Sequence, residues 1–410
     1  MLTMKPLDVQ KIRKDFPVLA KTMNGKPLVY LDNAATTQKP VQVIERMDHF
    51  YRNEYATVHR GVYTLSQNST WECDLVREKT RKFLNAKQVT EIIFTRGTTE
   101  SINLIAHGWG RKFLKPGDEI ILTEIEHHAN IVPWQIVAGE KGAKIRVIPV
   151  NDRGELILEE YKKLLNPRTK MVAVGHISNA LGTIHPVAEI IKLAHAAGAL
   201  VSIDGAQGAS HTKVDVQAMD CDFYSFSGHK AYGPTGIGVL YAKQALLEAM
   251  DPYQSGGEMI QIVSFEKTTY AKPPFKFEAG TPAIVETVGL GPALDYLTNL
   301  GFDRIEAHEQ ELLAEATKKL SAVPGLKIIG TAARKAAVVS FELENIHPHD
   351  IGTILDQEGI AIRTGHHCSQ TTMKRFKVPA TARASFSFYN TKQEIDVLVS
   401  GLHKVREMFK

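Results

Sequence analysis

The feature that most constrains the fold is a regular alternation of short apolar runs with stretches of helical periodicity. Runs typical of buried strands lie at residues 91–94, 119–122, 144–148, 170–174, 200–203 and 238–241. Helical stretches lie between them, such as residues 187–197, whose apolar stripe from Val187 to Ala194 ends before Gly198. Strands that alternate with helices predict a doubly wound α/β fold, in which helices cover both faces of a mainly parallel sheet.

The pattern changes near residue 290. A long charged helical stretch through Leu320, a second group of strands around residues 337–341 and a final helix from Lys392 predict a smaller α+β domain. We therefore expect three parts in the 410-residue chain. They are an N-terminal segment that packs on the small domain (1–25), a large ligand-binding domain (26–290) and a small C-terminal domain (291–410).

Composition limits the partners of the protein. Lys and Arg number 49 and Asp and Glu 45, a balance too even for a nucleic-acid or anionic-membrane footprint, so we expect a small-molecule or protein partner. No apolar stretch approaches a membrane span and residues 1–6 lack the apolar core of a signal peptide, which indicates a cytoplasmic protein. Cys73, Cys221 and Cys368 show no metal-ligand spacing and no close pair, so neither a metal site nor a disulfide framework is expected.

A lysine in an unusual setting is the strongest indication of chemistry. Ser227-Gly228-His229-Lys230 directly follows the apolar run 223–226. A lysine at the end of a buried strand loses part of its ammonium form, so its amine becomes nucleophilic and can hold an aldehyde as a Schiff base. Pyridoxal phosphate is the aldehyde that recurs in proteins. Taken alone, the motif is also compatible with a strand that runs into a basic turn.

Other polar residues follow the predicted strands, at the edge where ligands of open α/β sheets bind. Asp204 follows one run, and a buried carboxylate there would suit a protonated pyridine nitrogen, with Gln207 donating to the ring oxygen. His127 follows another run and would stack on a planar cofactor and relay protons. The alternatives are a tight turn at Asp204 and, at His127, polar residues that open a helix.

The segment Thr95 to Glu100 reads as a glycine turn that leads into a helix N-terminus. Free N–H groups and the helix dipole suit a phosphate there, and the threonine hydroxyls would add donors. An N-cap without a ligand is the alternative. The glycines at 233, 236 and 238 do not follow the dinucleotide spacing, so a Rossmann cofactor is not favoured.

Together these motifs resemble the cysteine desulfurases, and more specifically the SufS-type (group II) enzymes among the class V aminotransferase-like proteins of fold type I. The resemblance extends from Tyr30-Leu31-Asp32 to the C-terminal helix. The segments that carry it are Ser227-Gly228-His229-Lys230, Asp204-Gly205-Ala206-Gln207, Glu126-His127-His128 and Arg363-Thr364-Gly365-His366-His367-Cys368. It implies the fold of pyridoxal phosphate (PLP)-dependent transferases, with the Cys368 loop on the small domain.

The resemblance also implies roles for cofactor-binding residues. Lys230 would be the Schiff-base lysine, Asp204 the partner of the pyridine nitrogen, Gln207 the donor to the ring oxygen and His127 the stacking residue and proton shuttle. The phosphate would be held by Thr98, Thr99, Ser227 and His229, and by Thr281 from the other subunit of a homodimer.

Substrate recognition is implied in the same way. Arg383 resembles the arginine that clamps the α-carboxylate, a task that suits bidentate guanidinium donors, and Asn179 would lie beside it. Arg363 would be a supporting residue. His59 and Arg60 match a family motif near the site, although a surface loop remains the alternative for them.

Cys368 decides the reaction. A thiolate is the competent nucleophile, and the neighbouring His366, His367 and Arg363 are expected to favour it electrostatically. The other two cysteines lack such neighbours and are expected to be packing or surface residues. The chain departs from the family pattern directly after Cys368, where Ser369-Gln370 stands in place of an Ala-Met or Ala-Gln continuation.

The expected activity is conversion of L-cysteine to L-alanine with a persulfide left on Cys368. The resemblance implies that this sulfur passes to a SufE-like or SufU-like acceptor for iron–sulfur cluster assembly. Selenocysteine lyase is an alternative on the same fold. Another class V PLP enzyme, such as an aminotransferase or kynureninase, would leave Cys368 unexplained, and a non-catalytic scaffold would leave Lys230 unexplained.

Overall fold

A seven-stranded sheet forms the centre of the computed structural model, which describes residues 5–409. Strands β9, β8, β7, β5 and β6 run parallel in that order, and β10 lies antiparallel between β9 and β4. The predicted α/β fold with a mainly parallel sheet is confirmed. The strands are β4 (Ile92–Thr95), β5 (Glu119–Thr123), β6 (Lys144–Ile148), β7 (Thr169–Gly175), β8 (Leu200–Asp204), β9 (Phe223–Ser227) and β10 (Gly238–Ala242).

Helices cover both faces of this sheet, because alternate residues of each buried strand point to opposite sides. Tyr224 and Phe226 of β9 face one apolar cluster, whereas Phe223 faces another. The first cluster receives α3 (Thr64–Leu84), α7 (Leu158–Leu164), α8 (Val187–Ala196) and α12 (Ile284–Leu300). The second receives α4 (Thr98–Ile105), α6 (Val132–Lys141) and α11 (Gln244–Ala249).

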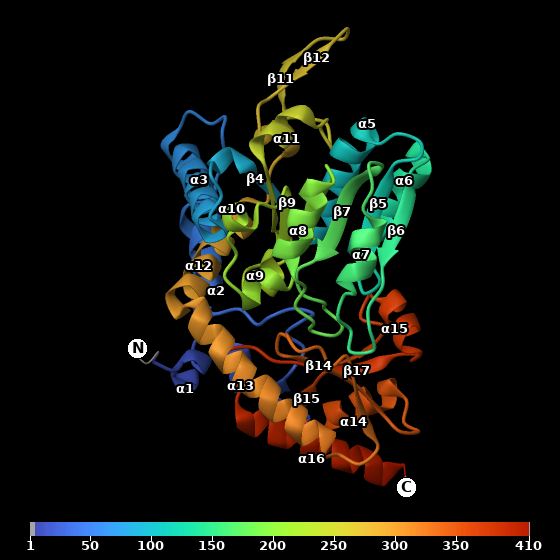
Figure 1. Ribbon diagram of the computed structural model, residues 1–410. Helices are drawn as coiled ribbons and strands as arrows, with labels where there is room; N and C mark the ends of the chain where they lie inside the picture. Colours follow the sequence, from blue (N-terminus) through green and yellow to red (C-terminus); the bar gives the residue numbers. More distant parts are fainter. Residues whose placement is uncertain (1–4, 410) are drawn as a thin grey trace.

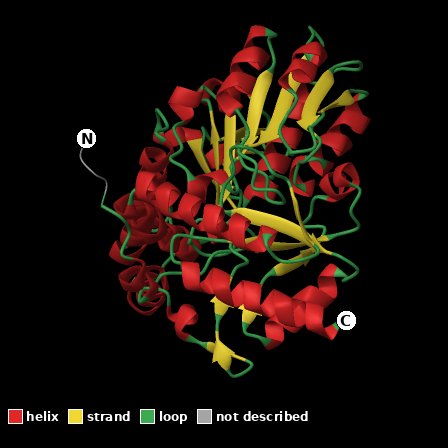
Figure 2. Ribbon diagram, turned by 60° about the horizontal axis from the view of Figure 1, so that its bottom comes forward, coloured by secondary structure: helices red, strands yellow, loops and turns green. Residues whose placement is uncertain are grey.

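A smaller antiparallel sheet lies below the large one in Figure 1, in the order β13-β14-β17-β16. Long helices pack on it around a separate apolar cluster, and Figure 2 shows them beside its strands. The final helix predicted from Lys392 is confirmed. These elements are α13 (Phe302–Ser321), β13 (Leu326–Ile329), β14 (Val338–Leu343), α14 (Pro348–Gln357), β16 (Arg363–Gly365), β17 (Thr381–Ser385) and α16 (Lys392–Met408).

The long helical stretch expected from residue 290 to Leu320 is two helices. Gly301 separates α12 from α13 with a φ of 83°, a left-handed conformation that favours glycine and ends α12. Helix α12 lies against α2 (Val41–Asn53) and α3, while α13 lies against α16. A charged pattern that continues across a glycine does not reveal this change of direction.

The N-terminal part of the chain contacts both sheets. Phe16 follows α1 (Val9–Arg13) and joins the apolar cluster on one face of the large sheet. Arg13 donates to the carbonyl of Tyr389, which follows the last strand of the small sheet, across 2.8 Å. Strand β3 (Val29–Tyr30) pairs in parallel with β15 (Ile360–Ala361) beside the small sheet. Residues 1–4 of the predicted segment lie outside the described residues, and the predicted boundaries at 25 and 290 stay predictions.

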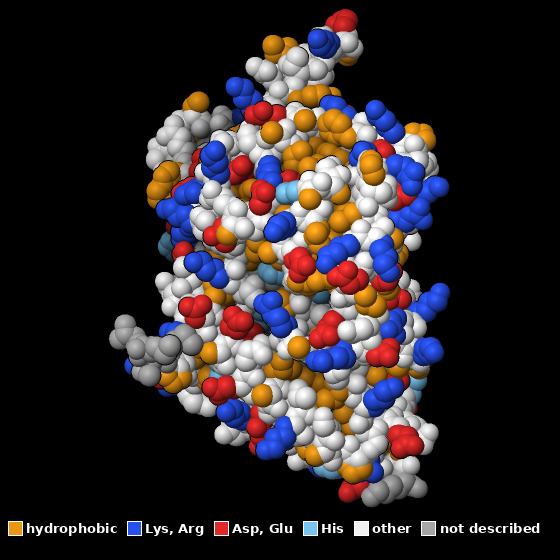
Figure 3. Space-filling view, viewed as in Figure 1, with side chains coloured by type: hydrophobic (Ala, Val, Ile, Leu, Met, Phe, Trp, Pro, Cys, Tyr) orange, Lys and Arg blue, Asp and Glu red, His pale blue; other side chains and the backbone are white. Residues whose placement is uncertain are grey.

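A hairpin of β11 (Ile260–Val263) and β12 (Thr268–Tyr270) projects from the top of the molecule in Figure 1. Positive and negative side chains are interspersed over the face shown in Figure 3. Within residues 5–409, no helix combines the length and the apolar character needed to cross a membrane. The remaining short strands and α-helices are β1 (Thr22–Met23), β2 (Lys26–Pro27), α5 (Arg111–Phe113), α9 (Gly208–His211), α10 (Val216–Met219) and α15 (Gln370–Phe376).

Candidate active site

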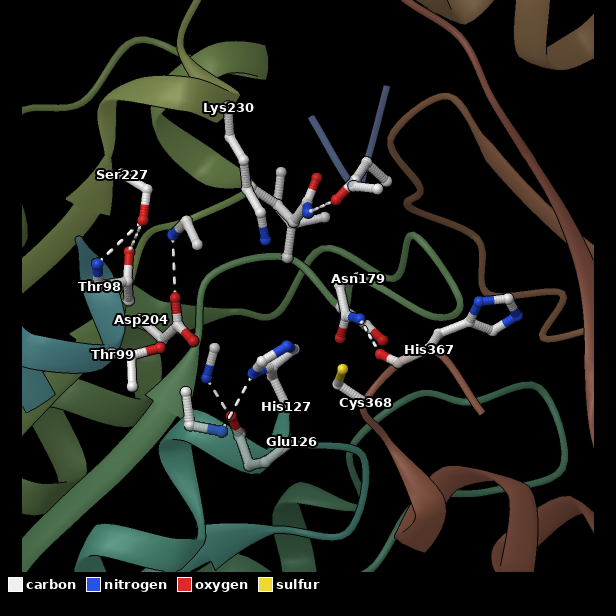
Figure 4. Close-up of a pocket in the computed structure, with 18 of the residues that line it drawn as sticks. Thr98, Thr99, Glu126, His127, Asn179, Asp204, Ser227, Lys230, His367 and Cys368 are labelled. Carbon is white, nitrogen blue, oxygen red and sulfur yellow. Dashed lines mark hydrogen bonds between the residues drawn. The ribbon is translucent and has the colours of Figure 1, made fainter. Parts of the chain in front are cut away.

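A cavity of about 230 Å³ lies where the carboxyl ends of β5, β7, β8 and β9 meet loops of the small sheet. Parallel strands bring the residues that follow them to one edge, so side chains far apart in the sequence converge here (Figure 4). The sequence-predicted residues that line the cavity are Thr98, Thr99, His127, Asn179, Asp204, Gln207, Ser227, His229, Lys230, Arg363, Cys368 and Arg383.

Three predicted site residues lie outside this cavity. Thr281 is exposed and does not line this cavity. His59 and Arg60 lie near Glu258, and Nε of Arg60 is 2.9 Å from Oε1 of that residue. A single subunit therefore does not bring these three residues to the cavity.

Lys230 follows β9 in a short 3-10 turn, Gly228–Lys230, and its amine enters the cavity. The turn is fixed through the carbonyl of His229, which accepts from Nζ of Lys39 across 2.9 Å and from N of Thr37 across 3.1 Å. Burial lowers the pKa of Lys230, while the Asp204 carboxylate acts in the opposite direction. This combination maintains a reactive amine in a fixed place.

Asp204 ends β8 and is 8% exposed. Burial raises its pKa, and the weaker opposing effects come from the N–H of Ala206, 2.9 Å from Oδ1, and from Lys230. A cationic ligand atom beside Asp204 would stabilise its charged form. Gln207 is buried close by and donates to the carbonyl of Ala34 across 2.7 Å, which orients its amide.

The N-terminus of α4 forms another side of the cavity. Gly97 precedes the helix with a φ of 153°, and both the N–H and the hydroxyl of Thr98 lie 2.9 Å from Oγ of Ser227. A Cβ atom at Gly238 would lie 2.4 Å from Cα of Gly97, so these backbones approach too closely for a larger residue. Hydroxyls at a helix N-terminus suit a phosphate group.

His127 begins the turn after β5, and its Nδ1 accepts the N–H of Ala129 across 3.0 Å. Burial lowers the pKa of His127 to about 3, with the positive charge of Lys230 as a smaller cause. The imidazole is therefore uncharged at neutral pH before any ligand binds, with Nε2 left to exchange a proton or to contact a ring.

Glu126 lies fully buried behind His127. Its carboxylate accepts from the hydroxyl of Thr123 across 2.6 Å, from Nδ2 of Asn130 across 2.8 Å and from the N–H of Gly175 across 3.0 Å. Burial raises its pKa to about 7 despite these donors. Glu126 thus ties the turn that carries His127 to the neighbouring strand β7.

Arg383 lies on the side of the cavity that belongs to the small sheet and is 1% exposed. Its Nη2 donates to Oδ1 of Asp32 across 3.0 Å and its Nη1 to the carbonyl of Asn179 across 2.8 Å. Among residues 5–409, its buried Nε has no hydrogen-bond partner. An orphaned guanidinium donor beside the cavity fits a carboxylate.

Cys368 is exposed at the cavity, in the loop between β16 and α15. Its Sγ points into the space beside His127 and Asn179 (Figure 4). His367 and Cys368 have φ values of 54° and 55°, and a non-glycine residue held in this region is strained by roughly 1–3 kcal/mol. The loop therefore presents its thiol in a conformation that the surroundings must maintain.

The expected electrostatic help from His367 is not found. Its Nε2 lies 2.8 Å from the hydroxyl of Thr381, and burial lowers its pKa to about 3, with the charges of Arg383 and Arg363 as smaller causes. An uncharged imidazole cannot favour a thiolate through its charge. Arg363 lines the cavity and stays available for this purpose.

Sequence reasoning missed several residues that build the site. Asp32 and Glu126 lie within motifs of the resemblance, but the sequence did not indicate a role for either residue. Residue spacing within such a short motif cannot show that Asp32 contacts the distant Arg383. His185 is a buried residue of the cavity wall, and neither of its ring nitrogens has a hydrogen-bond partner within the described chain. Burial lowers its pKa to about 3. Nothing local in the sequence marks His185.

An amine at the end of β9, a buried carboxylate at the end of β8 and a helix N-terminus with hydroxyls surround one cavity of a doubly wound sheet. Lys230, Asp204 and Thr98 therefore fit the aldehyde, pyridine nitrogen and phosphate of PLP. The fold and the cavity define a PLP-dependent enzyme of fold type I.

Comparison with known proteins narrows this class. Residues 29–398 match the aminotransferase class V family, whose cofactor is PLP. A cysteine desulfurase from Synechococcus elongatus is 54% identical over 399 residues, which are 97% of this chain and 64% of that protein. A cysteine desulfurase from Dickeya dadantii is 51% identical over 401 residues, 98% of this chain and 97% of that protein.

A solved structure gives the same result. The cysteine desulfurase CsdA from Escherichia coli matches with a TM-score of 0.92 and 40% identity, over 98% of this chain and 100% of that chain. The chain belongs to the class V aminotransferase family and, within it, to the cysteine desulfurases.

Proposed function

We propose that this enzyme converts L-cysteine to L-alanine and retains the sulfur as a persulfide on Cys368. The observation that carries the proposal is the presence of an exposed thiol, a buried amine and an orphaned guanidinium donor in one cavity. Cys368, Lys230 and Arg383 supply these three groups. The thiol distinguishes this site from one that only exchanges amino groups.

Substrate binding is assigned to the side of the cavity formed by the small sheet. Nε of Arg383 faces no competing acceptor within the described residues and would donate to the α-carboxylate. Arg363 lines the same wall and adds positive charge, while Asn179 holds Arg383 through its carbonyl. A carboxylate held in this way places the sulfur of the amino acid on the side of Cys368.

PLP, when bound, stores the electron pair that the substrate's α-carbon releases with its proton. The residues that would hold PLP are Lys230, Asp204, Gln207, His127, Thr98, Thr99, Ser227 and His229. The amine of Lys230 takes up the proton, since burial lowers its pKa and so increases its basic form. Asp204 would stabilise a positive charge on the ring nitrogen, and His127 lines the same cavity.

The sulfur step is a displacement at sulfur. The Cys368 thiolate forms an S–S bond with the substrate sulfur while the bond from that sulfur to the β-carbon breaks. The electron pair of the broken bond stays on the carbon, which takes up a proton and becomes the methyl group of alanine. The overall change is L-cysteine plus the Cys368 thiol to L-alanine plus the Cys368 persulfide.

The test is a single-turnover reaction of the PLP-loaded protein with L-cysteine and without a reductant. We expect one alanine for each site and a gain in mass of one sulfur atom on the peptide that contains Cys368. Free sulfide should appear only after a thiol reductant is added. Sulfide release with no modified peptide would contradict the proposal.

We infer further that the persulfide is passed to a SufE-like or SufU-like protein for iron–sulfur cluster assembly of the SUF type in the cytoplasm. The exposure of Cys368 at the cavity supports transfer to a second protein. Adding either acceptor with limiting reductant should raise the rate of alanine formation, and labelled sulfur should move to the acceptor. No stimulation and no transfer with both acceptors would show a different destination.

A homodimer completes the proposed phosphate site. Thr281 is exposed and lies outside the cavity of its own subunit, as a residue contributed to a partner would. Light scattering should give a mass of two chains, and Thr281→Ala should weaken PLP binding without changing that mass. A monomer that binds PLP with full affinity would contradict the proposed dimer. The assignment of His59 and Arg60 to the substrate site stays a prediction.

A further inference from the structure

The loop that carries Cys368 is fixed to the turn that follows β5. The backbone N–H of His128 donates to the carbonyl of Cys368 across 2.8 Å. The imidazole of the same residue accepts the N–H of Gln370 at its Nε2 across 3.0 Å. His128 therefore contacts the loop on both sides of Ser369. Its neighbour His127 lines the cavity, so one turn contacts both the cavity and the Cys368 loop.

Ser369 makes the central contact between the two segments. It is fully buried, and its hydroxyl donates to the carbonyl of Glu126 across 2.9 Å. Because a serine hydroxyl has one proton, the hydroxyl of Thr372 must be the donor in the 2.6 Å contact between Thr372 and Ser369. Ser369 stands at the N-cap of α15, where serine usually caps its own helix, yet its side chain makes no such bond. Its hydroxyl serves the contact with Glu126 instead.

These contacts surround a strained residue. His367 and Ser369 are buried, whereas Cys368 between them is exposed and shares with His367 a left-handed backbone. Such conformations persist only where the surroundings hold them. On the N-terminal side, Nδ2 of Asn179 donates to the carbonyl of His367 across 2.7 Å. On the other side, the holding contacts are those of Ser369 and His128.

We propose that Ser369 and His128 are positioning residues for sulfur transfer, which hold the Cys368 loop against residues 126–128 so that the thiol points into the cavity. Neither side chain touches the reacting atoms, and both act through Cys368. This inference rests on the proposed function, in which Cys368 is the nucleophile. It assigns a role to the side chain of Ser369, at which the sequence is expected to depart from the family pattern.

Ser369→Ala in the PLP-loaded enzyme tests the proposal. Loss of the hydrogen bond to Glu126, together with the one accepted from Thr372, should lower kcat for L-cysteine by about 3- to 10-fold, with KM changed less than about twofold. Alkylation of Cys368 by iodoacetamide should become faster, because a released loop lets the thiol turn out of the cavity toward the reagent. Amide hydrogen exchange at residues 366–370 should accelerate as well. Slower turnover together with faster alkylation is the signature of lost positioning.

Variants of His128 provide the rescue experiment. His128→Leu removes the acceptor for the N–H of Gln370 and should behave like Ser369→Ala. His128→Gln keeps a side-chain oxygen that can accept this bond and should recover most of the turnover. Thr391→Ala is the matched control, because Thr391 caps α16 through the N–H of Glu394, away from the cavity. This control should lose stability but leave turnover and alkylation as in the wild type.

Wild-type kcat in Ser369→Ala, or a lower kcat with unchanged alkylation and exchange, would overturn the proposal. Equal effects in Thr391→Ala would also overturn it, since general destabilisation would then be the cause. Failure of the proposed function gives a different result, because the wild-type enzyme would form no alanine from L-cysteine. The alkylation and exchange measurements would still show whether Ser369 and His128 hold the loop.

Discussion

Nη2 of Arg383 donates to Oδ1 of Asp32 across 3.0 Å inside the cavity wall. Burial raises the pKa of Asp32 and lowers the pKa of Arg383, and in both cases the charge of the partner opposes the effect of burial. The pair thereby keeps a guanidinium charged where a substrate carboxylate would bind. Asp32 acts through Arg383, since it does not line the cavity itself.

Asp32→Ala should therefore weaken substrate binding. Asp32 is partly buried, and loss of a hydrogen bond to a charged group typically costs about 1.5–3 kcal/mol, so we expect KM for L-cysteine to rise by about tenfold or more. Initial rates of alanine formation provide the measurement. Asp152→Ala is the control, because Asp152 is 98% exposed beside Arg375. An unchanged KM in Asp32→Ala would show that Arg383 keeps its position without this partner.

Lys230→Ala should abolish covalent retention of PLP and lower turnover by about 10²- to 10⁴-fold or more, because the variant lacks both the amine that binds the aldehyde and the base. The wild-type protein should keep its cofactor through borohydride reduction and denaturation, whereas the variant should release it. Lys335→Ala is a matched control: Lys335 is also buried, with its pKa lowered to about 8, but it lies outside the cavity. Covalently retained PLP in Lys230→Ala would exclude the assignment.

Cys368→Ala should separate sulfur from selenium chemistry. Selenium leaves carbon more readily than sulfur, so it needs less help from an enzyme nucleophile. We expect alanine formation from L-cysteine to be almost lost and that from L-selenocysteine to be largely retained. Cys73→Ala should affect neither, because Cys73 is buried outside the cavity and burial raises its pKa to about 12. An equal loss on both substrates would mean that Cys368 shapes the site without attacking the chalcogen.

Glu126 should make the stability of the protein pH-dependent. Its folded-state pKa of about 7 exceeds the ordinary value of 4.5, so the folded protein binds this proton more tightly than the unfolded chain does. The stabilisation that the protonated Glu126 carboxyl provides is complete below pH 4.5 and is lost as the pH rises through about 7. Between these limits, the free energy of unfolding of the wild type should fall by about 3 kcal/mol relative to Glu126→Gln.

Urea unfolding of both proteins across this pH range measures the difference. Glu119→Gln is a control of opposite sign, because the hydrogen bond from Arg146 is the main cause that lowers the pKa of Glu119. That carboxylate stabilises the protein above pH 4.5, so its removal should reduce stability at higher pH. A wild-type curve parallel to that of Glu126→Gln would mean that Glu126 keeps an ordinary pKa.

Much of the site could be predicted because it depends on strand ends. Asp204 and Lys230 each follow a buried run, and a sheet whose strands are mainly parallel brings the ends of such runs together. The helix break at Gly301 was missed because the helical pattern continues on both sides of it. The prediction that His367 helps the thiolate through its charge was wrong, because burial lowers the pKa of this histidine. That burial depends on contacts with segments distant in the sequence.

By itself, the sequence determined the alternation of strands and helices, the amine at the end of β9 and the motifs of the family, since these depend on residue type and spacing along the chain. Only the tertiary structure decided which of these residues share a cavity and which partners hold them. Asp32 meets Arg383 351 positions away, and Ser369 meets Glu126 243 positions away. Contacts of this kind form when two sheets pack together, and the same packing sets the burial that shifts the pKa values of Glu126 and Lys230.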